Sequence, residues 1–458
     1  MYEIKYRSPN EMKDSGVEWL GMVPKEWVNK KINWLFRNIG SGATPNTSIH
    51  KYYDNGDINW LLTGDLNDSY VYETSKKVTE LALKQNSALK IYPIETLVIA
   101  MYGATIGKLG ITRILTTTNQ ACCCFTNPIN TISKYIYYWF LGNRSHIINM
   151  GYGGGQPNIS KDLLLNLRIP IGPKNEQQQI VDFLDIKTAQ FDSIISKKEL
   201  LIKKLEEAKK SLISEVVTGK VKIIDGNMVP RQPEEMKDSG VEWLGMIPRD
   251  WHIKKLKYLM RINPTKSEVT NKNLLCSFVP MNKIHNDLIE TDEVKRVKEV
   301  YNGYTYFKDG DLIMAKVTPC FENGDIAIAE NLVNGLGFGT TEINVFRVND
   351  EYDKYFVYYA LQESHFMRYG ISHMTGVAGL KRIPTNYISN YKIPIPDQNE
   401  QKTVSNYIRG RIQIINSIIN KTQLQIQILK QAKQSLISEA VTGKIDLRDW
   451  EIIEEGGI

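Results

Sequence analysis

Two stretches of this chain decide its architecture, because each occurs twice. Residues 12–24 read MKDSGVEWLGMVP, and residues 236–248 read MKDSGVEWLGMIP, identical at 12 of 13 positions. Residues 208–220 read AKKSLISEVVTGK, and residues 432–444 read AKQSLISEAVTGK, identical at 11 of 13 positions. Both pairs are 224 positions apart, so the 458-residue chain holds two copies of one large module. A solenoid is disfavoured, since its repeats are about 20 to 50 residues long and more than two are stacked.

Each copy ends in a segment with the pattern of a long helix. Residues 176–217 contain neither glycine nor proline, and their apolar residues recur at helical spacing. The second copy repeats this pattern over residues 404–436, and each segment is followed by a glycine that favours a helix end, Gly219 or Gly443. We therefore expect two long coiled-coil helices. Their predicted seam and subunit-interface positions are Phe191, Ile194, Leu201, Leu205, Leu212, Ile415, Ile418, Leu429 and Leu436.

Polar residues interrupt both predicted seams. Lys198 lies in the first seam, and Thr422 and Gln425 lie in the second. A polar seam residue lowers stability but fixes the register, which favours one defined partner. The simplest arrangement pairs the two helices with each other, antiparallel if the halves obey a two-fold axis. Four apolar residues outside the seams would then leave surface for partner helices; they are Ile195, Ile213, Ile419 and Ile428.

The interiors of the two copies mix strand-like runs, such as residues 57–62 and 312–316, with shorter helical patterns. The predicted fold class is α+β, with two mixed α/β domains separated by two long antiparallel coiled-coil helices in a pseudo-two-fold internal repeat. The expected parts are a first mixed domain with its N-terminal segment over residues 1–174, a first long helix over 175–222, a linker with the repeated opening segment over 223–248, a second mixed domain over 249–398, a second long helix over 399–445 and a tail over 446–458.

The composition excludes several classes of protein. Hydrophobic residues make up 42% of the chain and charged residues 24%, which argues against disordered, collagen-like and disulfide-scaffold proteins. The net charge of +6 permits a polyanionic partner without requiring one. No apolar run approaches the roughly 20 residues that span a bilayer, and the first residues do not resemble a secretory signal, so we expect a cytoplasmic protein without membrane contact. The cysteine run Cys122–Cys124 alternates its side chains if it is a strand, which predicts partly buried, reduced thiols rather than a metal site.

Motifs for catalysis are poorly matched. Residues 103–109 are one residue short of a phosphate-binding loop and have leucine where a hydroxyl would bind magnesium. Residues 396–402 contain the residue types of one nuclease metal site, but they lie at the start of a predicted helix, where Glu176 and Glu400 suit the helix dipole. The histidines lack ligand spacing, and neither a G-x-S-x-G motif nor an adenine-methyltransferase tetrapeptide occurs. We therefore expect no catalytic and no metal site.

Polar, glycine-rich loops in each interior instead suit contact with DNA. Amide side chains read adenine edges, and Lys or Arg reads guanine or holds phosphates. Most such loops in proteins are only turns, so each contact is a separate prediction. The predicted DNA-binding residues are Thr44, Tyr102, Thr105, Lys108, Asn119, Gln120, Gln156, Asn158, Lys316, Thr318, Lys381 and Arg382.

The order of these parts resembles the specificity subunit of Type I restriction-modification systems. The resemblance covers residues 12–444 and rests on a helix that begins near I-P-I-x-x-x-x-E-Q and ends in S-L-I-S-E-x-V-T-G-K in both copies. It includes the duplicated V-E-W-L-G-M-[VI]-P-x-x-W at residues 17–27 and 241–251. The Ser-Gly-Ala-Thr-Pro turn at residues 41–45 also matches, whereas the second copy has Ile-Asn-Pro at residues 262–264. Such divergence is expected of two domains that read different half-sites.

The resemblance implies a chain without catalysis or cofactors of its own. Each interior would be a target-recognition domain for one half of a split site in double-stranded DNA, and the paired helices would set the spacer. The implied partners are two modification subunits, which use S-adenosylmethionine to methylate adenine at N6, and two restriction subunits, which use ATP and magnesium for translocation and cleavage. Two alternatives stay open: a scaffold or decoy that binds methyltransferase subunits without reading DNA, and an enzyme that acts alone.

Overall fold

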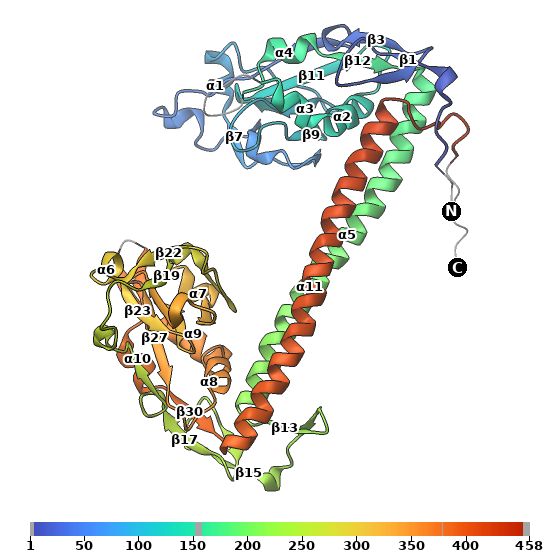
Figure 1. Cartoon of the computed structure of the whole chain (residues 1–458). Helices are drawn as coiled ribbons and strands as arrows, with labels where there is room; N and C mark the ends of the chain where they lie inside the picture. The colour runs from blue at the N-terminus through green and yellow to red at the C-terminus, as the bar shows by residue number, and fades with distance from the viewer. Residues whose placement is uncertain (1–3, 152–157, 378, 452–458) are drawn as a thin grey trace. The chain divides into compact units, whose positions relative to one another are not determined.

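The structure is a computed structural model that describes residues 4–151, 158–377 and 379–451. The chain forms two compact units, one from Met1–Lys198 with Leu424–Ile458 and one from Glu199–Gln423. Each unit joins a mixed α/β domain to part of both long helices (Figure 1). In the described part of the chain, no helix is long and apolar enough to cross a membrane. The α+β fold class with its internal repeat and two long helices is confirmed.

The first unit is built on a five-stranded sheet with the order β4-β11-β8-β9-β6, beside a three-stranded sheet with the order β10-β5-β7. Neighbouring strands are antiparallel except for β6 with β9 and β10 with β5. The strands are β1 (Met12–Asp14), β2 (Met22–Pro24), β3 (Val28–Lys31), β4 (Phe36–Gly40), β5 (Ile58–Leu61), β6 (Ser69–Val71), β7 (Lys76–Val78), β8 (Leu97–Ala100), β9 (Leu109–Thr112), β10 (Thr117–Thr118), β11 (Cys122–Pro128) and β12 (Arg168–Ile171). The short helices are α1 (Glu80–Gln85), α2 (Ser133–Gly142), α3 (Arg144–Asn149) and α4 (Lys161–Asn166).

The three adjacent cysteines lie on β11, and their side chains alternate between two cores. Cys123 packs into the large core with Leu97, whereas Cys122 and Cys124 pack into a smaller core with Tyr92. All three thiols are buried, and this burial raises the pKa of each of them. The thiols are therefore protonated at neutral pH, and they are more completely buried than the partly buried cysteines that we expected.

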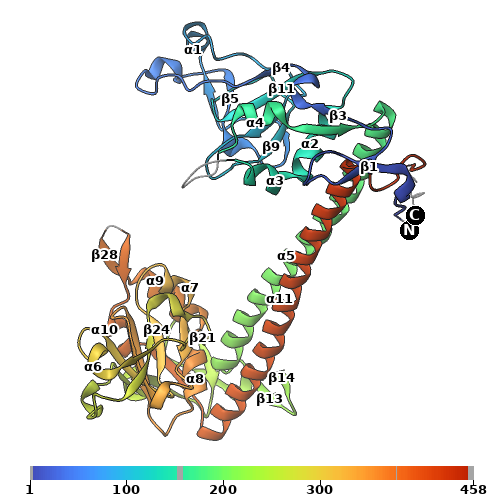
Figure 2. The ribbon, with the colours of Figure 1, turned by 45° about the horizontal axis from the view of Figure 1, so that its top comes forward.

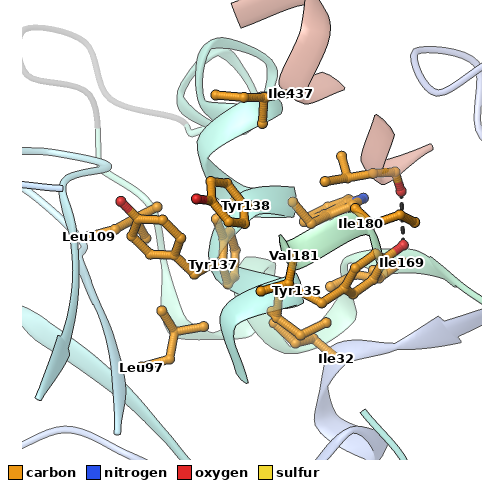
Figure 3. Close-up of a cluster of buried hydrophobic side chains, with 14 of the residues drawn as sticks. Ile32, Leu97, Leu109, Tyr135, Tyr137, Tyr138, Ile169, Ile180, Val181 and Ile437 are labelled. Carbon is orange, nitrogen blue, oxygen red and sulfur yellow. Dashed lines mark hydrogen bonds between the residues drawn. The ribbon is translucent and has the colours of Figure 1, made fainter. Parts of the chain in front are cut away.

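Helix α2 connects the sheet of the first unit to its long helices. Its tyrosines Tyr135, Tyr137 and Tyr138 point into different parts of the large core (Figure 3). The Tyr135 hydroxyl lies 2.8 Å from the carbonyl oxygens of Pro170, on β12, and Val441, at the end of the second long helix. The end of the second copy's helix is thereby built into the core of the first copy's domain.

The second unit contains two four-stranded sheets, with the orders β18-β27-β24-β25 and β22-β19-β26-β23. Its strands are β15 (Met236–Asp238), β16 (Met246–Pro248), β17 (His252–Lys255), β18 (Met260–Ile262), β19 (Leu275–Val279), β20 (Ile284–His285), β21 (Leu288–Ile289), β22 (Val294–Arg296), β23 (Thr305–Lys308), β24 (Leu312–Ala315), β25 (Ile326–Ile328), β26 (Leu336–Gly339), β27 (Ile343–Val348), β28 (Thr375–Val377), β29 (Leu380–Arg382) and β30 (Lys392–Ile395). Its short helices are α6 (Val297–Val300), α7 (Cys320–Asn323), α8 (Lys354–Ala360), α9 (Ser364–Ser372) and α10 (Thr385–Asn390).

The two long helices, α5 (Lys174–Val217) and α11 (Gln398–Val441), run antiparallel. In the first unit, Lys433 Nζ lies 2.7 Å from Asp192 Oδ1, and Lys198 Nζ donates to Gln425 Oε1 at 2.7 Å. Residue numbers fall along α11 as they rise along α5, which confirms the antiparallel pairing. One hydrogen bond thus joins the half-buried Lys198 and the exposed Gln425, two of the predicted polar seam positions.

The apolar seam differs from the predicted one. Ile195, Ile213 and Ile419, which were expected outside the seam, are buried, with exposed fractions of 7%, 2% and 9%. The predicted seam residues Ile194, Leu201 and Ile418 are instead exposed by 44%, 42% and 40%. The remaining predicted seam positions are half-buried, apart from the buried Leu436, and Ile428 is exposed as expected. Adjacent isoleucines offer two helical stripes, and the packing of the partner helix, which the linear pattern does not encode, selects one of them.

The start of each long helix is fixed by the repeated Asn-Glu-Gln sequence. Gln177 Oε1 accepts a hydrogen bond from the backbone amide of Ile132 at 3.1 Å, and Gln401 Oε1 accepts one from the amide of Asp353 at 2.8 Å. These amides lie just before α2 and α8. In each copy, the equivalent glutamine therefore joins the long helix to the equivalent short helix of the domain. This positions each α/β domain on its long helix.

The preceding glutamate binds an arginine and the repeated tryptophan. Glu176 accepts from Trp27 Nε1 at 3.0 Å and forms an ion pair with Arg7, which itself lies 3.0 Å from Glu26. The second copy repeats this arrangement with Glu400, Trp251 and Arg231. The glutamates lie in the first helical turn as expected, but their side chains hold the domain rather than only complementing the helix dipole.

The segment expected to be a polar linker is an ordered hairpin of β13 (Val221–Ile224) and β14 (Asn227–Pro230). Its two-residue turn, residues 225–226, has positive φ angles of 50° and 74°. After the hairpin, the Arg231 amide donates to the Lys220 carbonyl at 3.1 Å. The first copy makes the same bond between the two ends of the chain, from the Arg7 amide to the Lys444 carbonyl at 2.9 Å.

Candidate nucleic-acid interface

Five of the predicted contact residues in the first unit converge where β8 and β11 meet. The backbone amide of Met101 donates to the Ala121 carbonyl at 2.8 Å, which brings the loop after β8 next to Asn119 and Gln120. Thr44 Oγ1 lies 2.7 Å from Gln120 Oε1. Tyr102 forms an isolated β-bridge with Asn158.

The side chains of this group differ in their freedom to bind a ligand. Thr44, Gln120 and Asn158 are exposed, whereas Tyr102, Thr105 and Asn119 are half-buried. Thr105 lies in the turn that follows Tyr102, and Gln156 lies outside the described residues. The exposed amides and hydroxyl form a polar surface of the kind that reads base edges.

Lys108 lies apart from this group, in a cleft of about 600 Å³ in the first unit. Its ammonium is 3.0 Å from Asp68 Oδ2, and Arg144 also pairs with Asp68. Burial favours the neutral form of Asp68, but hydrogen bonds and charge from Arg144 and Lys108 outweigh this effect and lower its pKa. Lys108 is thus part of an internal ion-pair network, and contact with DNA would compete with Asp68. Asp68 and Arg144 were not among the predicted contact residues.

All four predicted residues of the second unit come together at the hairpin formed by β28 and β29. The Thr318 amide donates to the Lys381 carbonyl at 3.0 Å, and the Ile383 amide donates to the Lys316 carbonyl at 2.9 Å. Val317 forms a β-bridge with Arg382, at the position that Tyr102 and Asn158 occupy in the first copy. Equivalent backbone sites in the two copies therefore carry different side chains.

Arg382 is held by a two-pronged ion pair. Its Nε and one terminal nitrogen donate to the two carboxylate oxygens of Glu342, both at 2.9 Å. The hydrogen bonds from Arg382 lower the pKa of Glu342. Both side chains remain partly exposed, at 46% and 31%, so the fork is fixed in place at the surface.

Aromatic side chains line a second cleft, of about 420 Å³, at the base of this hairpin. Trp243 stacks on His365 with ring centroids 4.4 Å apart, and His365 Nδ1 lies 2.9 Å from the Tyr391 hydroxyl. Burial lowers the pKa of His365, so the ring is neutral at pH 7. In the first copy, Trp19 stacks on His146 with centroids 5.4 Å apart. The stacked pair thus belongs to the common frame of both units.

Among the described residues, no group of three or more His, Cys, Asp or Glu side chains is placed to hold a metal ion. The cysteines of the second unit, Cys276 and Cys320, are unpaired, and burial raises the pKa of both thiols.

Two long segments, residues 24–206 and 248–430, match the family described as the Type I restriction modification DNA specificity domain. The chain belongs to this family. Each match begins at the second half of a repeated opening segment and ends within a long helix. The duplicated domain therefore accounts for the repeat, and the resemblance inferred from the sequence is confirmed.

Individual relatives agree with this assignment. The chain is 31% identical over 55% of its length to the Type I restriction enzyme EcoEI specificity subunit of Escherichia coli, of which it spans only 42%. It is 26% identical over 98% of its length to the MjaIX specificity subunit of Methanocaldococcus jannaschii, and this match spans all of the relative. The fold is shared with a chain from a solved structure, whose description concerns complex assembly and conformational transition of the type I R-M system. The TM-score is 0.68 at 14% identity, and the match covers 92% of this chain and 99% of that one.

Proposed function

We propose that this chain is the DNA-specificity subunit of a Type I restriction-modification complex, with one half of a bipartite site read by each α/β domain. The main support for the proposal is that the two domains share equivalent backbone positions but carry different side chains in their loops. The bridge between Tyr102 and Asn158 and the bridge between Val317 and Arg382 occupy equivalent places, but their side chains differ in chemistry. An invariant scaffold with exchanged surface loops is what two half-sites of different sequence require.

The long helices would set the unspecified spacer between the half-sites. Helices α5 and α11 are each continuous over 44 residues and run from one unit into the other. A continuous helix lengthens by 1.5 Å per residue, so its residue count defines a distance. The facing pair Lys198 and Gln425 would fix the register of this ruler.

Exposed residues that are the same in both copies support a pair of identical partners. Met22 and Met246 are equivalent and are exposed by 43% and 49%, and the equivalent Glu18 and Glu242 are exposed as well. Divergence elsewhere shows that the copies have had ample opportunity to differ, so exposed identity at these positions points to a shared contact. We assign this contact to two modification subunits, with exposed apolar residues of the long helices as further surface.

The complex would also contain two restriction subunits, and the chemistry would reside in the partners. The modification subunits would use S-adenosylmethionine, and the restriction subunits would use ATP and magnesium. This chain would supply no catalytic group, and it would act in the cytoplasm, where its substrate is found.

Methylation sequencing tests the proposal. The chain is co-expressed with its modification subunit in cells that lack other adenine methyltransferases, and the methylated sites are mapped. We expect a single bipartite motif, and exchange of residues 25–174 for the corresponding segment of a relative should change only one half of it. A complex that assembles but methylates no defined motif would support the scaffold alternative instead. A motif with both halves altered by the exchange would contradict the division into two readers.

A further inference from the structure

The hairpin of β28 and β29 is a two-stranded ribbon of the second unit. Its three residue pairs are Thr375 with Arg382, Gly376 with Lys381 and Val377 with Leu380, and β29 also meets the segment after β24 through the bridge of Arg382 with Val317. Figure 2 shows the ribbon extending away from the rest of the second unit, with α9 close to its base. A two-stranded ribbon has the dimensions that enter the major groove of B-DNA.

The second strand of the ribbon is braced by the segment after β24. Thr318 Oγ1 donates to the Gly379 carbonyl at 2.7 Å and accepts from the Lys381 amide at 3.1 Å. The two-pronged pair of Arg382 with Glu342 holds the second strand from the side. A ribbon held in this way loses little conformational freedom on binding, which lowers the entropic cost of a contact at its tip.

The outer end of the ribbon is apolar. Val377 is exposed by 83%, and its cross-strand neighbour Leu380 is exposed by 47%. Side chains directly opposite each other in a ribbon point to the same face, so these two form one apolar pair. Most of this apolar surface is left in water, and a partner surface would bury it.

Charge near the base of the ribbon suits a duplex. Gly376 and Lys381 alternate with the apolar pair and occupy the other face of the ribbon, so Lys381 is exposed away from Val377 and Leu380. Lys316 lies beside the base and is half-buried. Lysine stems reach phosphates while a neighbouring face contacts base edges.

We propose that the β28–β29 ribbon enters the major groove of the second half-site and that Val377, with Leu380, contacts the methyl group of a thymine. This inference rests on the proposed function and names a reader that the polar-residue predictions omitted. The 5-methyl group of thymine is the one apolar feature of the major-groove edges, and aliphatic side chains recognise it by direct contact. Loss of one buried methyl contact corresponds to about a fourfold weaker affinity.

Replacement of thymine by uracil tests this contact, because uracil lacks only the methyl group. The specificity chain is assembled with its modification subunits, and affinity is measured on duplexes in which each thymine of the second half-site is replaced in turn. We expect one position at which uracil weakens binding by the wild-type complex about fourfold. The Val377→Ala complex should bind the thymine duplex as weakly as the wild type binds the uracil duplex, and it should no longer distinguish the two.

Val294→Ala provides the matched control, since Val294 lies in the same unit on β22 and is exposed by 45%. This variant should keep the full response to uracil, and thermal unfolding of both variants should equal that of the wild type. Equal sensitivity of wild type and Val377→Ala at every position would overturn the inference, as would a Val377→Ala loss that is the same on thymine and uracil duplexes. Failure of the wild-type complex to prefer any motif would instead refute the proposed function.

Discussion

Removal of the charge on Glu176 should destabilise the first unit strongly. The side chains of Arg7 and Glu176 are exposed by only 1% and 4%, and the indole of Trp27 donates to the same carboxylate. Glu176→Gln leaves the Arg7 guanidinium buried, with the half-exposed Glu26 as an ion-pair partner and the charge of Asp446 nearby. Breaking a buried pair from one side costs about 3 to 5 kcal/mol, and because Glu26 remains, we expect a loss of about 3 kcal/mol. For a unit of this size, that loss lowers the Tm by about 6 to 12 °C.

The second copy supplies an internal comparison. Arg231 and Glu400 make the same pair, but their side chains are exposed by 9% and 25%. Water compensates part of a lost charge at the more exposed site, so Glu400→Gln should destabilise the second unit by less, about 1 to 2 kcal/mol. Hydrogen exchange of the peptides at the start of α5 and of α11 separates the two units, which a single melting curve does not.

Removal of the arginine instead of the glutamate gives a pH signature. Burial raises the pKa of Glu176 despite the hydrogen bond from Trp27 and the charge of Arg7. Without Arg7 this pKa rises further, so the folded state binds a proton more readily than the unfolded chain, and stability increases relative to the wild type as the pH falls from 7 to 5. The deficit of Arg7→Met should therefore shrink over this range. The deficit of Glu176→Gln should not, because a guanidinium keeps its proton.

Two results would refute this reasoning. One is a Glu400→Gln variant that loses as much protection from exchange at α11 as Glu176→Gln loses at α5. The other is an Arg7→Met deficit that is constant between pH 5 and 7, which would show that Glu176 is not held in a buried, charge-disfavouring site.

Three further predictions address the loop scaffold, the ruler and the chain ends. A Cβ atom at Gly42 would lie 1.6 Å from the Thr118 carbonyl oxygen, so Gly42→Ala should lower the unfolding free energy by about 3 kcal/mol; an unchanged Tm of the first unit would contradict this. Insertion of one heptad into α5 and one into α11 lengthens the helix pair by about 10 Å. At 3.4 Å per base pair, the spacer of the methylated motif should then grow by about 3 base pairs. An unchanged spacer would show that the helices do not set the spacer length. Arg448 lowers the pKa of Asp446 to about 2. The wild type should therefore be more stable than Asp446→Asn by about 1 kcal/mol at neutral pH, and this difference should vanish as the pH falls from about 4 to 2. Urea unfolding at several pH values measures the difference, and a constant value would count against the ion pair.

The long helices could be predicted from the sequence because the spacing of their apolar residues is local and periodic. The antiparallel pairing followed from one symmetry argument, whereas the hydrogen bond between Lys198 and Gln425 was not predicted. The choice between Ile194 and Ile195 did not follow, since both fit a helical stripe and only the packing of the partner helix separates them.

The candidate DNA-contact loops could be predicted from the sequence only in part. The grouping of Lys316, Thr318, Lys381 and Arg382 depends on backbone bonds between segments about 60 residues apart, although each residue type was recognised as suited to DNA. Val377 was overlooked because an aliphatic residue in a linear pattern usually indicates a core position. Gly376 and Gly379, which both have positive φ angles, flank this position and are the signal that could have singled it out.

The protonated thiols of β11 have a practical consequence for the study of the complex. Burial raises the pKa of every cysteine in the chain, and four of the five are fully enclosed. Alkylating and cross-linking reagents react with the thiolate, so the native cysteines should react with them only slowly. A single cysteine placed at an exposed position such as 377 would then be the dominant reactive group, and its cross-links would report directly which nucleotides lie beside it.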